Sequence, residues 1–283
     1  MIIAALLSLK WEEERPEVLA TWVWESTDWM DDGGRLLSFA KEQGVNVIFL
    51  HIDRTSQDME PYRRFIEQAH RLGIEVEALG GDPSWGLAAY RQEVEAFLRW
   101  IEGYQRSAPE QARWDGVHVD IEPYLLEEWE QERATVVREW RESAAYVAHW
   151  VRKELSLRVS ADVPSWIHTI DDEQGESLGT WMLEQFDCIV LMNYRNAALG
   201  HNGIMDRALP MVQEGTRLGK PVLIGLETGP TDEGAHTTFY GQDSSSLWQQ
   251  MSITHLFMQW YSGYQGFSIH DYRNWRAAAE GRE

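Results

Sequence analysis

The chain has little cysteine and few basic residues, and both shortages exclude classes of protein. Cys188 is the only cysteine among 283 residues, so no disulfide can form within the chain. Lysine and arginine number 25 against 46 aspartates and glutamates, which gives a formal net charge of −21 at pH 7. Nucleic acid and anionic membranes bind cationic surfaces, so we expect neither as a partner. We expect a neutral ligand and, because like charges repel, a monomer.

The sequence also lacks linkers and a complete targeting segment. No Pro/Gly/Ser-rich stretch divides it, so we predict one domain over residues 1–283. Residues 1–9 are apolar, but they have no basic residues before them and no small-residue cleavage site, and they are too short to span a bilayer. We interpret residues 1–19 as an N-terminal extension and expect a cytoplasmic location.

Eight short apolar runs alternate with amphipathic helical stretches, which is typical of a parallel sheet with helical crossovers. The predicted strands are 20–26, 45–53, 74–81, 116–122, 157–164, 188–194, 221–228 and 266–272. Several helical stretches end in glycine just before the next strand, where a left-handed residue lets the chain reverse. No Gly-x-Gly-x-x-Gly fingerprint follows the first strand, as many doubly wound open sheets would have. The favoured fold is therefore a single (β/α)8 TIM barrel of the α/β class.

The fourth predicted strand, residues 116–122, carries an ionisable group at every second position. Side chains of a strand alternate between its faces, so His118, Asp120 and Glu122 share one face, opposite three aliphatic residues. Such a face needs a polar cavity, because buried charges without partners are costly. Pro123 ends the strand and places Glu122 at its C-terminal end, where barrel enzymes gather their catalytic residues. Asp120 and Glu122 are our first catalytic candidates.

Polar and aromatic side chains also end the other predicted strands. Glu227 ends the seventh strand and is the third catalytic candidate. Indole rings stack on apolar surfaces, including the C–H faces of sugars, so we give weight to the tryptophans near strand ends. The residues expected to bind substrate are Trp24, Trp85, His118, Asp162, Asn193, Tyr194, Arg195 and His270.

The segment Asp115-Gly116-Val117-His118-Val119-Asp120-Ile121-Glu122 resembles the Asp-Gly-x-Asp-x-Asp-x-Glu strand of the family 18 chitinases. Leu79-Gly80-Gly81 resembles their third strand, and Met192-Asn193-Tyr194 resembles their sixth. In that family the acetamido oxygen of the substrate is the nucleophile. The resemblance implies that Glu122 is the acid, that Asp120 orients the acetamido group and that Tyr194 donates a hydrogen bond to it. The chain has His118 and Arg195 where the family has aspartates.

A second resemblance is to the clan A glycosidases, whose acid/base glutamate ends strand four, commonly as Asn-Glu-Pro. Here the segment is Ile121-Glu122-Pro123, and Glu227 stands where that clan has its nucleophile, at the end of strand seven. This resemblance implies a retaining displacement, for which the two carboxyl groups should lie roughly 5–5.5 Å apart.

The predicted function is hydrolysis of a glycosidic bond in a neutral oligo- or polysaccharide. Glu122 is the general acid, and the second group is Glu227, or Asp120 with the substrate's acetamido group. We expect neither a cofactor nor a metal, since no His-x-His or His-Glu-x-x-His spacing is present. Two alternatives stay open. One is a metal-dependent TIM-barrel hydrolase with ligands from His51, His118, His270, Asp120 and Glu122. The other is a carbohydrate-binding barrel without catalytic activity.

Overall fold

The computed structural model describes residues 15–30, 33–56 and 58–281. Eight parallel strands form one closed barrel in chain order, and the last strand pairs with the first. The strands are β1 (Val18–Val23), β2 (Val47–His51), β3 (Glu75–Gly80), β4 (Gly116–Val119), β5 (Arg158–Pro164), β6 (Cys188–Met192), β7 (Val222–Glu227) and β8 (Tyr264–His270). The predicted (β/α)8 fold is confirmed.

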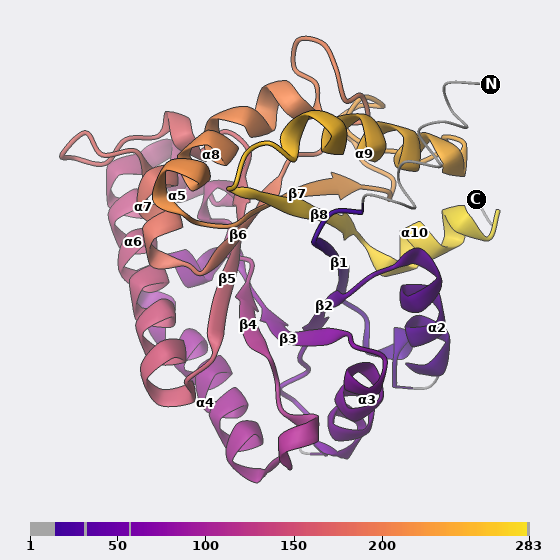
Figure 1. Cartoon of the computed structure of the whole chain (residues 1–283). Coiled ribbons are helices and arrows are strands. Elements are labelled where there is room, and N and C mark those ends of the chain that lie inside the picture. Colours follow the sequence, from indigo (N-terminus) through magenta and orange to yellow (C-terminus); the bar gives the residue numbers. More distant parts are fainter. Residues whose placement is uncertain (1–14, 31–32, 57, 282–283) are drawn as a thin grey trace.

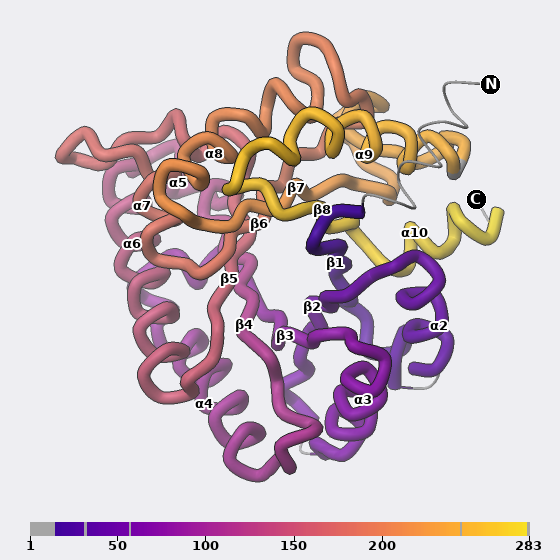
Figure 2. Tube along the Cα trace, in the orientation of Figure 1, coloured from indigo at the N-terminus to yellow at the C-terminus, as the bar shows by residue number. Residues whose placement is uncertain are grey.

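Helices surround this barrel (Figure 1), and the trace in Figure 2 shows the chain passing from each strand to the outside and back. The helices are α2 (Gly33–Gln43), α3 (Glu60–Arg71), α4 (Arg91–Ser107), α5 (Glu127–Gln131), α6 (Arg133–Trp150), α7 (Leu178–Gln185), α8 (Ile204–Leu218), α9 (Ser244–Met258) and α10 (Tyr272–Ala279). In α3 the buried residues Tyr62, Phe65, Ile66 and Ala69 recur at the spacing of one helix face. Of the helices that the structure describes, none combines the length and apolar composition that a membrane span requires.

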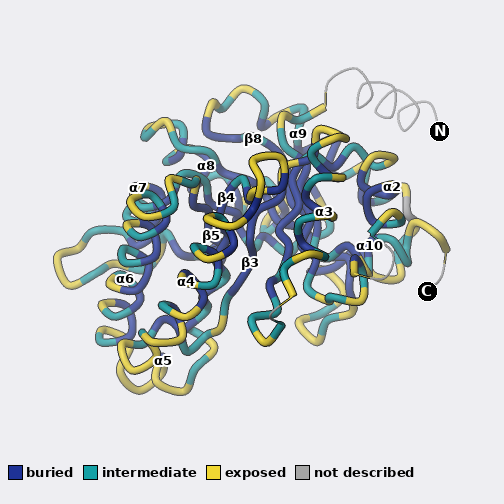
Figure 3. Tube along the Cα trace, turned by 90° about the horizontal axis from the view of Figure 1, so that it is seen from below, coloured by how far each residue is buried: buried dark blue, intermediate teal, exposed yellow. Residues whose placement is uncertain are grey.

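Two apolar cores follow from the alternation of side chains along the strands. The outer core lies between the strands and the helices, and it includes Val117 and Val119 of β4. The inner core fills the barrel and includes Trp22 of β1 and Phe49 of β2. Figure 3 shows the buried strands at the centre and the exposed segments at the periphery. The interior of the barrel is therefore packed with side chains and is not an open channel.

The strand ends differ from the predicted ones by no more than three residues. The difference matters at β4, which ends at Val119 instead of residue 122, because its last partner in β3 is Gly80 and the chain turns away there. Asp120 and Glu122 therefore lie in the loop that follows the strand. At the other terminus, β1 begins at Val18, so the last two residues of the predicted extension 1–19 belong to the barrel; residues 1–14 lie outside the described part.

Candidate functional site at the carboxyl end of the barrel

Strands β4 to β7 bring four carboxyl groups around one phenol at the carboxyl end of the barrel. The Tyr194 hydroxyl follows β6 and is close enough to Asp162, Glu227, Asp120 and Glu122 to interact electrostatically with each. Burial, and then these negative charges, raise the pKa of Tyr194 well above its ordinary value. The phenol therefore keeps its proton and acts as a hydrogen-bond donor. The three predicted catalytic residues all belong to this group.

Glu122 follows β4 directly and is partly buried. Burial raises the pKa of its carboxyl group, and the charge of Asp162 adds to the rise, while a hydrogen bond from the Tyr124 hydroxyl opposes it. A carboxyl group whose pKa is raised toward neutrality is suited to donate a proton to a leaving group. Tyr124 was not predicted as a site residue, although its position two residues after Glu122 was a signal that could have indicated it.

Asp120 lies beside Glu122 in the same loop, and the pKa of its carboxyl group is also raised. Burial, and then the charges of Asp162 and Glu122, raise the pKa of its carboxyl group well above the ordinary value. Its Oδ1 atom is buried and accepts no hydrogen bond from any residue that the structure describes. Buried polar atoms nearly always have a partner, so an oxygen of this kind is available to a ligand.

We expect Asp120→Asn to raise the melting temperature at pH 8 by a few degrees and to have little effect at pH 4. An unfolded aspartate has a pKa of about 3.9. Because the pKa is raised in the folded state, the folded protein holds a proton that the unfolded chain has lost, so stability falls as pH rises from the unfolded value through the folded one. Asparagine carries no charge and removes this loss. Thermal unfolding of the variant at both pH values is the measurement.

The matched control for that experiment is Asp232→Asn, since Asp232 is exposed on the loop after β7. Its melting temperature should follow that of the unmodified protein at both pH values. An Asp120→Asn stabilisation of equal size at pH 4 and pH 8 would contradict the proton linkage.

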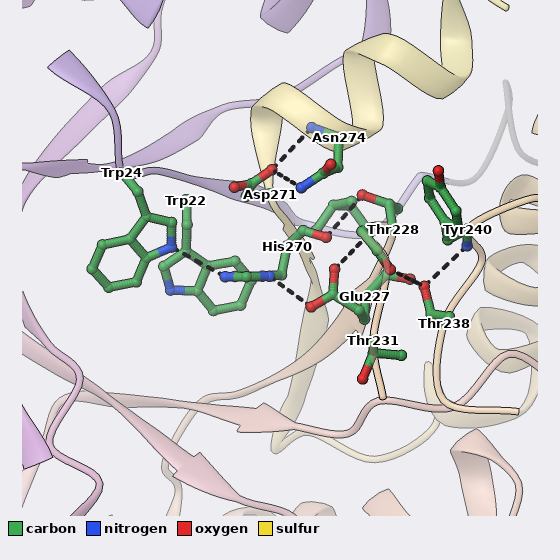
Figure 4. A network of polar contacts seen from close by, with 12 residues as sticks. Trp22, Trp24, Glu227, Thr228, Thr231, Thr238, Tyr240, His270, Asp271 and Asn274 are labelled. Atoms are coloured by element: carbon green, nitrogen blue, oxygen red, sulfur yellow. Dashed lines mark hydrogen bonds and ion pairs between the residues drawn. The ribbon is translucent and has the colours of Figure 1, made fainter. Parts of the chain in front are cut away.

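Glu227, at the end of β7, belongs to a chain of hydrogen bonds that runs to β8 and β1 (Figure 4). The Trp24 indole donates to His270 Nε2 at 3.1 Å, so that nitrogen is the acceptor and Nδ1 carries the proton. His270 Nδ1 lies 2.7 Å from Glu227 Oε2 and donates to it. The other oxygen, Oε1, accepts the backbone N–H of Gly229 at 2.5 Å. Both oxygens of Glu227 are thus engaged, in contrast to Asp120.

His118 was predicted to bind substrate, and the structure places it inside the barrel. Its side chain is 0% exposed and stacks on Phe49 with the ring centroids 3.8 Å apart. Nδ1 lies 2.7 Å from Ser160 Oγ, and Nε2 lies 2.9 Å from Asp162 Oδ2. The prediction that His118 and Asp120 share one face was correct. His118 precedes Asp120 by two residues, however, so it lies about 7 Å deeper in the barrel. It supports Asp162 from below.

Asn193 was also predicted to bind substrate, and the structure buries its side chain completely. Its side-chain amide donates to the carbonyl oxygen of Ile204 at 2.7 Å, which ties β6 to the start of α8. Arg195 donates to the backbone oxygen of Tyr194 at 2.5 Å and to Asn202 Oδ1 at 3.4 Å. Both residues therefore hold the loop after β6 that presents Tyr194.

Asp162 and Trp85 are at the predicted end of the barrel and are nearly buried. Asp162 Oδ2 accepts a hydrogen bond from the Trp22 indole at 2.9 Å, which fixes the carboxyl group beneath Asp120 and Glu122. Trp22 was missed in the sequence, although it lies on the same strand face as Trp24. Trp85 packs on Phe97 with ring centroids 5.2 Å apart.

The metal alternative has no ligand set in residues 15–281 as far as they are described, since no three side chains of His, Cys, Asp or Glu are grouped to hold an ion. The three histidines named for it differ in their contacts, although His51 and His270 both lie beside the Trp24 ring. His51 lies beside the Trp24 ring, His118 binds Ser160, and His270 binds Glu227.

Two cavities lie near the loops at the carboxyl end of the barrel. One, of about 360 Å³, lies at the ends of β2 and β3, next to β4, the strand that Asp120 follows. The other is a groove of about 660 Å³ between α6 and residues 170–174, on the outside of the barrel. Arg141 and Trp181 line the groove, but the carboxyl groups around Tyr194 do not. The groove is therefore separate from the carboxyl groups around Tyr194.

Comparison with known proteins finds similar solved structures. The C-terminal domain of a putative chitinase from Desulfitobacterium hafniense DCB-2 superposes with a TM-score of 0.60 at 14% identity, covering 94% of this chain and 97% of that one. The β-mannanase from the blue mussel Mytilus edulis superposes with a TM-score of 0.59 at 10% sequence identity, covering 94% of this chain and 90% of the mannanase. A chitinase from Chromobacterium violaceum ATCC 12472 superposes with a TM-score of 0.57 at 11% sequence identity, covering 94% of this chain and 98% of the chitinase. The similarity shows that the chain shares the (β/α)8 barrel fold of these structures. No family model and no curated protein sequence matches the chain.

Proposed function

We propose that this glycoside hydrolase-like barrel cleaves the glycosidic bond of an N-acetylhexosamine and that the substrate's own acetamido oxygen is the nucleophile. The observation that carries the proposal is the pair formed by Asp120 and Glu122. Both carboxyl groups have raised pKa values, and Asp120 also presents an oxygen without a partner among the described residues. The pair places an acid, Glu122, beside a hydrogen-bond acceptor, Asp120.

Each residue of the pair has one task in this mechanism. Glu122 gives its proton to the glycosidic oxygen as the bond to the anomeric carbon breaks. The acetamido oxygen attacks that carbon, and Asp120 accepts the acetamido N–H, which stabilises the positive charge that develops on the group. Tyr194 keeps its proton and donates to the acetamido group. Water then opens the cyclic intermediate, and Glu122 takes the proton back.

Glu227 is the less suitable nucleophile because both of its oxygens already accept hydrogen bonds, from Gly229 and His270. To attack the anomeric carbon, Glu227 would have to use an oxygen lone pair that these hydrogen bonds stabilise. We assign Glu227 the task of holding His270, which in turn accepts from Trp24. The indole is thereby fixed at the edge of the mouth, where it can contact a sugar.

A comparison of aryl glycosides with and without an N-acetyl group tests the proposed nucleophile. We expect release of 4-nitrophenol from 4-nitrophenyl N-acetyl-β-glucosaminide, and at least about 10³-fold slower release from the corresponding β-glucoside and β-mannoside, because an intramolecular nucleophile is worth this much or more. In the same assay Glu227→Gln should keep the acetamido activity within about tenfold, a loss typical of a positioning contact. If the unmodified protein instead cleaves the β-glucoside or β-mannoside, and Glu227→Gln abolishes this cleavage, then Glu227 is the nucleophile.

A further inference from the structure

Four polar side chains lie inside the barrel, and the mechanism above assigns them no proton transfer. They are Glu77 of β3, His118 of β4, and Ser160 and Asp162 of β5, and all four are buried. We refer to them as the interior cluster. Buried ionisable groups are costly unless each is paired. Their contacts therefore indicate where the protons of the interior cluster lie.

Three contacts join the interior cluster in the order Glu77, Ser160, His118 and Asp162. The Ser160 hydroxyl donates to Glu77 Oε2 at 2.5 Å, and Ser160 Oγ lies 2.7 Å from His118 Nδ1. His118 Nε2 lies 2.9 Å from Asp162 Oδ2, in an ion pair that is bent away from a linear hydrogen bond. One imidazole thus joins two carboxyl groups, and a hydroxyl group lies between it and the first of them.

These contacts require a proton on each ring nitrogen of His118. A serine hydroxyl has one proton, and because Ser160 gives it to Glu77, Oγ is the acceptor toward Nδ1. At 2.9 Å an unprotonated Nε2 would repel the carboxylate oxygen of Asp162, so Nε2 is protonated as well. His118 is therefore an imidazolium. The ring of Phe49 stacks on it with an interplanar angle of 14°, which places an aromatic face against the cation.

The charges at the Glu77 end of the interior cluster suit a proton that moves. Arg158, at the start of β5, lies 3.6 Å from Glu77 Oε1. Burial raises the pKa of Glu77, and the charge of Glu75 adds to the rise, while the charges of His118 and Arg158 and the hydrogen bond from Ser160 oppose it. Glu77 is therefore a carboxylate that can accept a proton.

The charges at the other end belong to the proposed catalytic site. The charge of Asp162 contributes to the raised pKa values of Asp120, Glu122 and Tyr194. The thiol of Cys188 also faces Asp162, but burial raises its pKa to such an extent that it stays neutral. A positive charge on the imidazole beside Asp162 therefore opposes the negative potential that acts on the catalytic carboxyl groups.

A proton can move along the interior cluster without leaving the protein. The Nδ1–H bond of His118 breaks as an O–H bond forms on Ser160, while the hydroxyl proton of Ser160 forms a new O–H bond with Glu77. The imidazolium and the carboxylate of Glu77 both become neutral in this step. The interior cluster keeps its total charge, but the positive charge beside Asp162 is lost.

We propose that Glu77, Ser160 and His118 form a buried proton relay that sets the charge beside Asp162 and thereby the protonation of the two catalytic carboxyl groups. The effect on catalysis rests on the proposed function, whereas the relay itself does not. The three side chains are positioning residues, since they act on the site through Asp162.

The relay is tested first by NMR of protein labelled with ¹⁵N-histidine. At pH 7 both ring nitrogens of His118 should be bonded to protons, and His118→Gln identifies the signals by their loss. In Glu77→Gln the new side chain can still accept from Ser160, but it has no negative charge and cannot take the proton. His118 should then retain one ring proton. A single protonated nitrogen in the unmodified protein, or two in Glu77→Gln, would overturn the relay.

The matched control is Glu75→Gln, on the same strand as Glu77. Glu75 also pairs with Arg158, at 2.5 Å, but it is exposed and lies outside the interior cluster. This variant should leave the signals of His118 and the activity as they are in the unmodified protein.

The second test is the pH profile of kcat with 4-nitrophenyl N-acetyl-β-glucosaminide. Glu77→Gln and Ser160→Ala should shift the descending limb to higher pH by about one unit, the effect of one nearby unit charge, because loss of the imidazolium raises the pKa of Glu122 further. Ser160→Thr keeps the hydroxyl group and should restore the profile. A structural role alone would lower kcat without moving the limb, and a limb that stays in place in both variants overturns the proposed link to the site.

Failure of the proposed function gives a different result. The unmodified protein would then cleave no glycoside, and the NMR signals of His118 would still decide about the relay.

Discussion

Replacing Glu122 by glutamine is expected to lower kcat by about 10²- to 10⁴-fold, the usual contribution of a general acid. Glutamine has the size of the glutamate and can still accept the hydrogen bond from Tyr124, but it has no proton to give to the leaving group. The loss should be smaller for 2,4-dinitrophenyl glycosides, whose leaving group departs without protonation. Measurement of kcat for both leaving groups, with circular dichroism to verify the fold, separates loss of the acid from loss of structure.

The pH dependence gives a second readout for the same residue. Glu122 acts in its protonated form, and its pKa is raised by burial, so kcat should fall as pH rises through that pKa. The descending limb should be absent from the residual activity of Glu122→Gln. Glu128→Gln, at an exposed position of α5, is the matched control and should behave as the unmodified protein does.

A barrel that binds sugars without cleaving them would give another outcome. The unmodified protein would then bind chitotriose but release no aryl alcohol, and Glu122→Gln would leave the affinity nearly unchanged. If Glu122→Gln instead abolishes an existing turnover, the non-catalytic alternative is excluded.

Gly81→Ala is expected to lower the free energy of unfolding by about 3 kcal/mol, the upper end for overpacking. A Cβ atom at this position would overlap the carbonyl oxygen of Asp120. That oxygen belongs to the backbone, so it cannot move away as the end of a flexible side chain can. The chain must shift β3 or the loop after β4, and the second shift also displaces Asp120 and Glu122. Urea unfolding measures the stability, and the acetamido assay should show a parallel loss of activity.

The control for this substitution is Gly103→Ala in α4, where the added Cβ would meet no described atom within 4 Å beyond its chain neighbours and the backbone of its own helix. Alanine is the better helix former, so this variant should be more stable by up to about 1 kcal/mol. If Gly81→Ala unfolds at the same urea concentration as the unmodified protein, the close approach of β3 to Asp120 has no importance for the fold or the site.

Much of the architecture could be predicted because it is encoded locally. The apolar runs and the helical spacing between them identified eight strands, and parallel strands in this order close into a barrel. Alternation along residues 116–119 correctly placed His118 on the inner face and Val117 and Val119 on the outer one. The position of Asp120 and Glu122 near the carboxyl end of β4 follows from the same pattern.

Depth within the barrel could not be predicted from alternation. The sequence shows which face a residue occupies, but His118 and Asp120 share that face and differ by one layer of the interior. The depth of Asn193, whose side chain donates a hydrogen bond to the backbone of Ile204, could not be predicted either. Where the mouth begins depends on how far neighbouring strands extend, and β4 stops where β3 turns away at Gly80.

The sequence by itself determined the barrel and the set of carboxyl groups at its carboxyl end, because a periodicity of two and the strand ends are properties of short segments. Only the tertiary structure decided which carboxyl oxygens have no partner among the described residues, and these include Oδ1 of Asp120 and Oδ1 of Asp162. Glu227 is engaged by His270, 43 residues away, and that histidine by Trp24, 246 residues away. Asp120 keeps an oxygen without a partner among the described side chains. Such contacts join residues that only closure of the barrel brings together, and no local pattern reports them.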